Sequence, residues 1–268
     1  MELTFYKYHG AGNDFILFDD FAGGLHEQFD QTSIAQLCDR RFGIGADGMM
    51  FLRAHADYDF EMVYYNSDGA PSSMCGNGGR CIVRFAADRG YINDNCSFLA
   101  VDGPHQASLM TDGWVSLQMS DTKKVVQAEV PDAAFVDTGS PHVVQTGYDP
   151  ATVDVNTVGR NLRNAPAYKE AGVNINFVNR DSDGRILIAT YERGVEDETL
   201  ACGTGVTAAA LAAATDDQLA VGSIFSYDVL AKGGELRVRG EVADHGFSNI
   251  WLEGPTAFVF KGTMDLLT

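Results

Sequence analysis

A four-residue pattern, Cys-Gly-x-Gly, occurs twice in this chain, and each copy comes before a run of good helix formers. The first copy occupies residues 75–78 and the helical run covers residues 80–88, whereas the second copy occupies residues 202–205 and leads into residues 206–214. Glycines allow unusual backbone angles, so this arrangement predicts a tight loop that opens a helix. We therefore expect a helix to begin beside Cys75 and another beside Cys202.

The N-terminus of a helix favours negative charge, because its first N–H groups are unpaired and the helix dipole is positive there. A thiol at such a position tends to have a lowered pKa and an accessible thiolate. Two such sites, one in each half of the chain, suggest two thiols that face one ligand.

The order strand, polar turn, Cys-Gly-x-Gly, helix and further strands occurs in both halves of the chain. Residues 59–65 form the expected strand before the first motif, and residues 185–191 form the one before the second. A duplication of this size implies two similar halves with a cleft between them. We expect domains at residues 1–120 and 121–255, because apolar alternation fades after Ser120, and we expect residues 256–268 to return to the first domain as a terminal strand.

Composition excludes several classes of partner. The formal net charge of −18 argues against nucleic acid and anionic membranes. The N-terminal residues lack the pattern of a signal peptide, and no apolar run approaches the ~18 residues of a membrane span. Five cysteines without framework spacing fit reduced thiols in a cytoplasm. No spacing typical of a zinc site occurs, so we expect no metal.

A glycine-rich segment at residues 43–48 matches the dinucleotide fingerprint G-x-G-x-x-G. That fingerprint requires a strand before it and a helix after it. Here a helix is expected before it, over residues 34–41 with Thr32 and Ser33 as the cap, and a strand after it. The segment is therefore interpreted as a connecting loop, and no nucleotide cofactor is expected.

Two thiols on opposite sides of one ligand suit three kinds of chemistry. Inversion at a carbon that bears hydrogen needs a base on one face and an acid on the other, and cysteine serves in either role. Disulfide redox more often uses cysteines that are close in sequence. Metal binding needs further ligands that the spacing does not supply. Inversion is favoured, and the helix N-termini would also bind a carboxylate.

Four segments of the chain resemble the motifs of one known family. They are residues 8–15 (YHGAGNDF), residues 41–48 (RFGIGADG), residues 74–80 (MCGNGGR), and the pair YERG at 191–194 with ACGTG at 201–205. In this order they are similar to the signature set of diaminopimelate epimerase. The resemblance implies an α/β (α+β) fold of two similar domains, each a strand-rich, barrel-like sheet around a central helix. It also implies a cofactor-independent enzyme that interconverts LL- and meso-2,6-diaminoheptanedioate for lysine and cell-wall synthesis.

The resemblance also implies roles for individual residues. Cys75 and Cys202 match the base and the acid. The residues that match substrate-contacting positions are Asn13, Asn66, Gly76, Asn77, Asn174, Glu192, Arg193, Gly203 and Thr204. His142 and Glu192 match polar groups that help to set the protonation of the thiols.

The chain departs from the family pattern at two positions that are expected to face the ligand. Gly48 stands where some members carry glutamine, and Ser140 stands where many carry asparagine. Two other readings are open: a proline or hydroxyproline racemase of the same architecture, and a non-catalytic or redox binding protein. The expected partner is a small-molecule substrate, and the sequence leaves the oligomeric state open, with a homodimer as one option.

Overall fold

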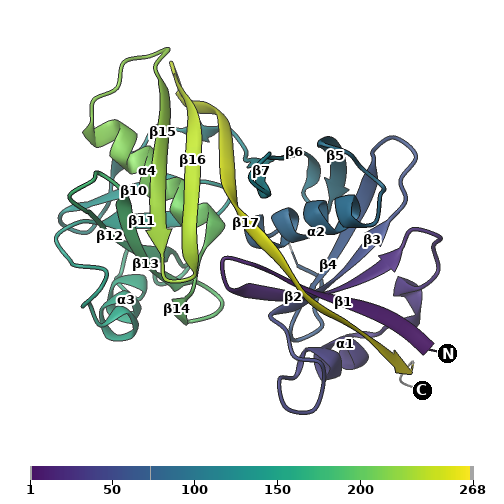
Figure 1. Ribbon diagram of the computed structural model, residues 1–268. Helices are drawn as coiled ribbons and strands as arrows, with labels where there is room; N and C mark the ends of the chain where they lie inside the picture. The colour runs from purple at the N-terminus through teal and green to yellow at the C-terminus, as the bar shows by residue number, and fades with distance from the viewer. Residues whose placement is uncertain (1, 73, 266–268) are drawn as a thin grey trace. The chain divides into compact units, whose positions relative to one another are not determined.

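The computed structural model describes residues 2–72 and 74–265, and the chain divides into two compact units. Unit 1 comprises Met1–Leu117 and Gly254–Thr268, and unit 2 comprises Gln118–Glu253. Of the first domain expected from the sequence, Met1, Ser73 and residues 266–268 lie outside the described residues. Each unit is an α+β fold in which a barrel-like sheet surrounds one buried helix (Figure 1).

Unit 1 alternates antiparallel and parallel strand pairs. Its strands are β1 (Glu2–Gly10), β2 (Asn13–Asp20), β3 (Gly48–Arg53), β4 (Phe60–Asn66), β5 (Asn95–Ala100), β6 (Gly103–Leu109) and β7 (Trp114–Gln118). The pairs β1–β2, β3–β4 and β5–β6 are antiparallel, and the pairs β2–β3 and β4–β5 are parallel. A parallel pair needs a crossover, which helix α1 (Gln31–Cys38) supplies for β2–β3 and helix α2 (Gly76–Asp88) supplies for β4–β5.

Unit 2 repeats this arrangement. Its strands are β8 (Thr122–Lys123), β9 (Val126–Gln127), β10 (Ala133–Asp137), β11 (Pro141–Gln145), β12 (Asn174–Arg180), β13 (Ile186–Glu192), β14 (Asp197–Thr199), β15 (Ile224–Ala231) and β16 (Gly234–Ala243). The pairs β10–β11, β12–β13 and β15–β16 are antiparallel, and β11–β12 and β13–β15 are parallel. Helices α3 (Val155–Arg163) and α4 (Gly203–Asp216) supply the crossovers. The internal duplication expected from the sequence is confirmed.

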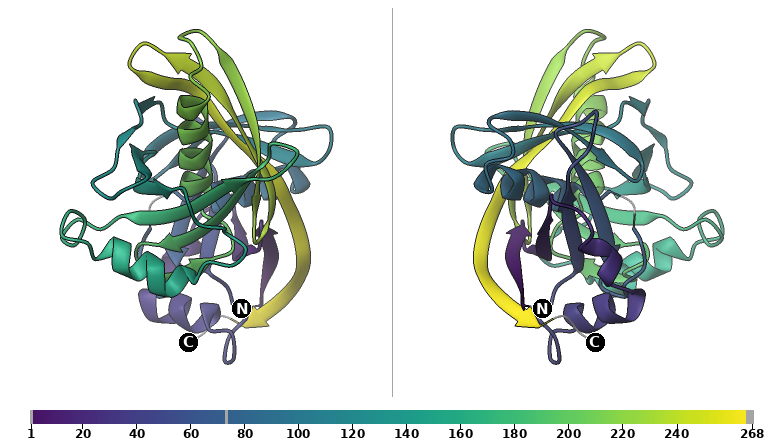
Figure 2. Two further views of the ribbon diagram at one scale, coloured as in Figure 1. Left: turned by 90° about the vertical axis from the view of Figure 1, so that its left-hand side faces the viewer. Right: turned by 90° about the vertical axis from the view of Figure 1, so that its right-hand side faces the viewer.

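The second crossover helix of each unit is the buried one. Helix α4 (GTGVTAAALAAATD) carries six alanines between residues 208 and 214, and it packs against β10, β11, β12, β13, β15 and β16. Alanine is the best helix former, and its small side chain lets strands approach the helix on all sides. Figure 2 shows α4 (green) running between the strands of unit 2. In unit 1, α2 packs against β1, β2, β3 and β6.

The first crossover helix of each unit covers an outer face of the sheet. Ile34 and Leu37 of α1 join a cluster with Phe18 and Phe51, whereas Val155 of α3 joins a cluster in unit 2. Helix α1 begins at Gln31 and ends at Cys38, so the expected range of residues 34–41 was too late. The N-cap is Asp30, whose carboxylate accepts from the Ser33 N–H at 2.8 Å while the Ser33 hydroxyl accepts from the Asp30 N–H at 2.9 Å. Ser33 therefore belongs to a capping box as its N3 residue.

The C-terminal strand β17 (Gly246–Asp265) is continuous, and it begins ten residues before the terminal strand expected at residues 256–268. Its first part pairs with β16 as far as Glu253, and its last part pairs with β1 from Thr256 onward. Pro255 lies where one partner ends and the other begins, so its missing N–H removes no ladder hydrogen bond. Residues 256–265 of β17 thus pair along β1, a strand of the first half of the chain.

Candidate active site

Cys75 and Cys202 occupy the same position in the two units, as the sequence indicates. Each is the N-cap residue of its buried helix, with φ −109° and ψ 127° at Cys75 and φ −107° and ψ 110° at Cys202. Their carbonyl oxygens accept the first helical hydrogen bonds, from Gly79 N at 2.6 Å and from Val206 N at 2.8 Å. Neither thiol caps its helix. Each sulfur therefore sits at the positive end of a helix dipole, where a thiolate or a bound carboxylate is stabilised.

In unit 1, the side chain of Asn13 lies against Cys75. Its Oδ1 is 3.7 Å from the Cys75 Sγ and 3.3 Å from the Asn77 Nδ2. Its Nδ2 donates to Asp47 at 2.6 Å. Because a carboxylate only accepts, Asp47 fixes the orientation of the amide and turns the Asn13 oxygen toward the helix N-terminus.

A charged network holds Asp47 in turn. Arg40 donates to both oxygens of Asp14, at 3.0 and 2.6 Å, and to Asp47 at 2.6 Å, while the Lys7 ammonium lies 2.7 Å from Asp14. Burial alone would raise the pKa of Asp14, but the hydrogen bonds from Arg40 and Lys7 outweigh it and hold that pKa well below its usual range. Sequence reasoning missed these charges as a group, although Asp14 and Asp47 stand inside two of the quoted motifs.

Arg80 is the second feature of this site that the sequence did not reveal. It is fully buried inside α2, where it donates to the carbonyl oxygen of Gly76 at 3.1 Å and to the Asn77 Oδ1 at 2.9 Å. Burial lowers the pKa of Arg80, and nearby thiolate at Cys81 or Cys75 would raise it. Arginine keeps its charge in proteins, so a buried cation supports negative charge on Cys75.

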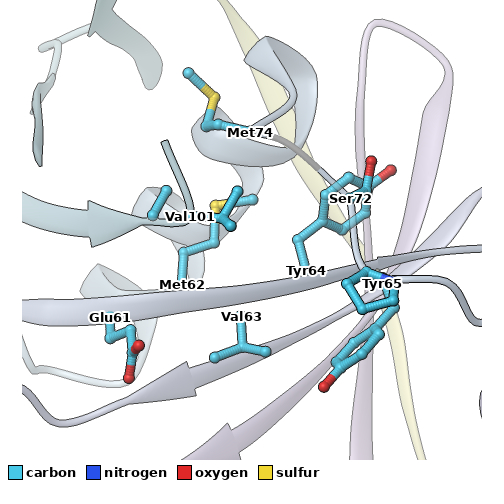
Figure 3. Close-up of a pocket in the computed structure, with 10 residues that line it drawn as sticks. Glu61, Met62, Val63, Tyr64, Tyr65, Ser72, Met74 and Val101 are labelled. Carbon is cyan, nitrogen blue, oxygen red and sulfur yellow. The ribbon is translucent and has the colours of Figure 1, made fainter. Parts of the chain in front are cut away.

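Asn66 and Gly48 face each other across β3 and β4. A Cβ at Gly48 would lie 2.6 Å from the Tyr64 Cε2, so the Tyr64 ring fills the direction in which a side chain would point. Tyr64 also lines a cavity of about 220 Å³ together with Met62, Ser72 and Met74, which Figure 3 shows beside the segment that leads to α2. Cys75 is not among the residues that line this cavity, so the cavity lies next to the thiol site rather than at it.

In unit 2, a chain of hydrogen bonds leads to Cys202 from the sheet. The Asn176 Nδ2 is 3.0 Å from the His142 Nδ1, and the His142 Nε2 is 2.9 Å from the Thr204 hydroxyl. The same hydroxyl is 3.4 Å from the Cys202 Sγ. His142 on β11 and Thr204 on α4 are thereby brought to the thiol, whereas Asn176 on β12 and its partner Thr190 on β13 are contributions that sequence reasoning did not assign.

The imidazole of His142 is fully buried. Burial lowers its pKa from the ordinary 6.5 to about 3, and the positive charge of Arg193 adds to this effect, while the hydrogen bond with Asn176 opposes it. His142 is therefore neutral at physiological pH, and one of its ring nitrogens is a donor and the other an acceptor.

A third group of predicted residues meets in unit 2. The Asn174 Nδ2 donates to the Ser140 hydroxyl at 2.8 Å, and the Arg193 N–H donates to the Asn174 Oδ1 at 2.8 Å. The guanidinium of Arg193 donates to Ala171 O at 3.2 Å and lies 3.5 Å from the Ser140 hydroxyl. Glu192 is the last residue of β13 and directly precedes Arg193. A planar cation next to a fixed amide and a hydroxyl suits a carboxylate ligand.

Within residues 2–72 and 74–265, no three His, Cys, Asp or Glu side chains gather as a metal ion would require. No helix there is long and apolar enough to cross a bilayer.

The fold is shared with solved structures of low sequence identity. A phenazine biosynthesis protein of the PhzF family from Bacillus anthracis aligns with a TM-score of 0.73 at 13% identity, covering 98% of this chain and 99% of that chain. A probable proline racemase from Agrobacterium radiobacter aligns with a TM-score of 0.69 at 17% identity, covering 98% of this chain and 93% of that chain. At such identities the likeness shows the architecture alone.

Closer relatives share one name. Diaminopimelate epimerase from Flavobacterium psychrophilum is 45% identical over 98% of this chain and 100% of its own, and the same enzyme from Chlorobaculum tepidum is 40% identical over 96% of this chain and 99% of its own. The family model described as diaminopimelate epimerase matches residues 5–125 and again residues 134–258. The two matches correspond to the two duplicated units, and the chain belongs to the diaminopimelate epimerase family of isomerases.

Proposed function

We propose that the protein interconverts LL- and meso-2,6-diaminoheptanedioate by a two-base mechanism that needs no cofactor. The observation that carries this proposal is the equivalent placement of Cys75 and Cys202, each at the N-terminus of a buried helix in one of two duplicated units. The names of the curated relatives supply the substrate.

In each turnover one cysteine acts as a thiolate and the other as a thiol. The thiolate removes the α-proton from one face of the substrate carbon, and the thiol gives its own proton to the opposite face. The configuration inverts, the two cysteines exchange protonation states, and no electron is gained or lost. The N–H groups of Gly76 and Asn77 and those of Gly203 and Thr204 stabilise the carboxylate as negative charge develops on it. The two compact units are thus two halves of one enzyme, each with one catalytic cysteine.

The remaining polar groups bind the rest of the substrate. Arg193 would hold the distal carboxylate, with Asn174 and Ser140 beside it, because an arginine fork matches a carboxylate in two places. Asn13, Asn66 and Glu192 are proposed as further substrate contacts. His142 and Glu192 would help to set the protonation of the thiols, and Gly48 is a supporting position that the Tyr64 ring covers.

The experiment is to incubate purified protein with pure LL-diaminopimelate and to follow the meso form by chiral chromatography. Turnover is expected without pyridoxal phosphate, nucleotide or metal, and at an unchanged rate after dialysis against a chelator. Free L-proline and trans-4-hydroxy-L-proline serve as alternative substrates. Inversion of proline but not of diaminopimelate would replace this proposal by the racemase, and absence of any inversion would favour a binding protein.

We further propose that the enzyme lies in the cytoplasm, where its cysteines remain reduced. The homodimer stays a prediction, which sedimentation analysis of the purified protein would decide.

A further inference from the structure

The amide of Asn176 has only one orientation that satisfies its neighbours. Its Nδ2 lies 3.0 Å from the carbonyl oxygen of Val143, which can only accept. Its Oδ1 accepts from the Thr190 hydroxyl at 3.0 Å. Turning the amide over would place two acceptors against each other at Val143 in a site where Asn176 and Thr190 are both buried, and a buried acceptor without a donor is costly.

This orientation fixes the tautomer of His142. The nitrogen of Asn176 that faces the His142 Nδ1 is a donor, so Nδ1 is the acceptor of that bond. A neutral imidazole then carries its proton on Nε2, which donates to the Thr204 hydroxyl. Because that hydroxyl oxygen receives a proton from His142, its own proton is available for the Cys202 sulfur, 3.4 Å away.

We propose that Asn176 and Thr190 are positioning residues, which hold His142 as the Nε2–H tautomer and thereby set the Thr204 hydroxyl to donate to the Cys202 sulfur. A hydrogen bond donated to the charged form of a group favours that form, so the relay favours the thiolate of Cys202. His142 acts in it as a fixed donor and does not itself accept the substrate proton. The inference rests on the proposed function where it treats Cys202 as catalytic. The hydrogen bonds of the relay do not depend on that function.

Two charged residues, Arg193 and Asp137, lie on the elements packed against His142. Arg193, after β13, opposes protonation of His142. The carboxylate of Asp137, at the end of β10, accepts from the Gly139 N–H at 3.0 Å. The thiolate of Cys75 is stabilised in a different way, by the charge of the buried Arg80 cation. The relay of Asn176 and His142 should therefore influence only one of the two thiols.

The first measurement is the tautomer of His142 in the wild-type protein. Long-range ¹H–¹⁵N correlation spectra distinguish a protonated ring nitrogen from an unprotonated one, and loss of one ring system in His142→Gln assigns the signals. We expect a neutral ring with the proton on Nε2 at pH 7. A proton on Nδ1, or an imidazolium, at that pH would overturn the proposal, and this result requires no variant of Asn176 to fold.

The second measurement is the pKa of each thiol, taken from the pH dependence of alkylation by iodoacetamide with peptide mass spectrometry. Thr204→Val removes the donor and should raise the pKa of Cys202 by roughly one unit, the worth of one hydrogen bond. Thr204→Ser keeps the hydroxyl and should restore the wild-type value, and Asn176→Ala and Thr190→Val should shift it in the same direction as Thr204→Val.

Cys75 is the internal control, since its pKa should not move in these four variants. An unchanged Cys202 pKa in Thr204→Val, or equal shifts at both cysteines, would contradict the relay. These results do not depend on epimerase activity. An inactive wild-type protein with the expected tautomer and thiol shifts would refute the proposed function and leave the relay standing.

Discussion

Gly205 and Asn176 approach each other so closely that a Cβ at position 205 would collide with the Asn176 Oδ1. The second glycine of the motif in unit 2 is thus required by a side chain from β12, and not only by the turn into the helix. The equivalent Gly78 in unit 1 is less confined, because a Cβ there would meet the Met50 Sδ at 3.4 Å, an ordinary contact.

Gly205→Ala is therefore expected to destabilise the protein. Overpacking a buried site costs about 1–3 kcal/mol, which exceeds the gain of up to ~1 kcal/mol from replacing a helical glycine. Gly78→Ala is the matched control and should be neutral or slightly stabilising. Urea denaturation of both variants measures the difference, and equal stabilities would mean that Asn176 moves aside without cost.

Cys75→Ala and Cys202→Ala should each abolish measurable epimerisation, since inversion needs both a donor and an acceptor. In heavy water, each variant should label one isomer of diaminopimelate in preference to the other, because in the proposed mechanism each thiol faces one side of the α-carbon. Cys96→Ala, at a buried cysteine in β5, should keep most of the activity. Equal labelling of the same isomer by both active-site variants would point to a single base.

The burial of His142 predicts a pH dependence of stability. Its pKa in the folded state, about 3, lies below the ordinary value of 6.5 expected for the unfolded chain. Unfolding therefore binds a proton, so stability is fully present above pH 6.5 and declines as the pH falls from there toward 3.

The change in unfolding free energy between pH 7.5 and pH 5.0 should accordingly be smaller in His142→Gln than in the wild type. Urea titrations of both proteins at the two pH values measure it. His245 lies in the turn between β16 and β17, and His245→Gln is the control, which should keep the wild-type difference. An identical difference in all three proteins would show that the imidazole of His142 takes up a proton as readily in the folded state as in the unfolded one.

Arg80→Met should raise the pKa of the Cys75 thiol, because it removes a buried positive charge close to the sulfur. Arg80→Lys keeps the charge and should reduce the effect. The pH dependence of alkylation at Cys75 measures the shift, with Cys202 as the reference thiol in the same sample. A pKa at Cys75 that does not respond to Arg80→Met would mean that the helix N-terminus alone supports the thiolate.

The sequence by itself determined the features that depend only on residues adjacent in the chain. Glycines followed by helix formers placed Cys75 and Cys202 at helix starts, and the strands expected at residues 59–65 and 185–191 lie within one residue of β4 and β13. The start of α1 was harder to predict, because Asp30 and Thr32 are both residue types that can cap a helix. In the structure Asp30 is the N-cap. No local signal marks Pro255 as the point where the partner of strand β17 changes from β16 to β1.

Only the tertiary structure decided how the thiols are supported. An arginine in a helix is usually exposed, but the sheet surrounds α2 and Arg80 is fully buried. Asp47 orients Asn13, and Asn176 orients His142, across 34 positions of sequence in each case. Such pairs carry no local signature, because their geometry arises when distant strands and helices pack together. The hydrogen-bond direction at Cys202 follows from Val143, a backbone acceptor that no sequence pattern marks.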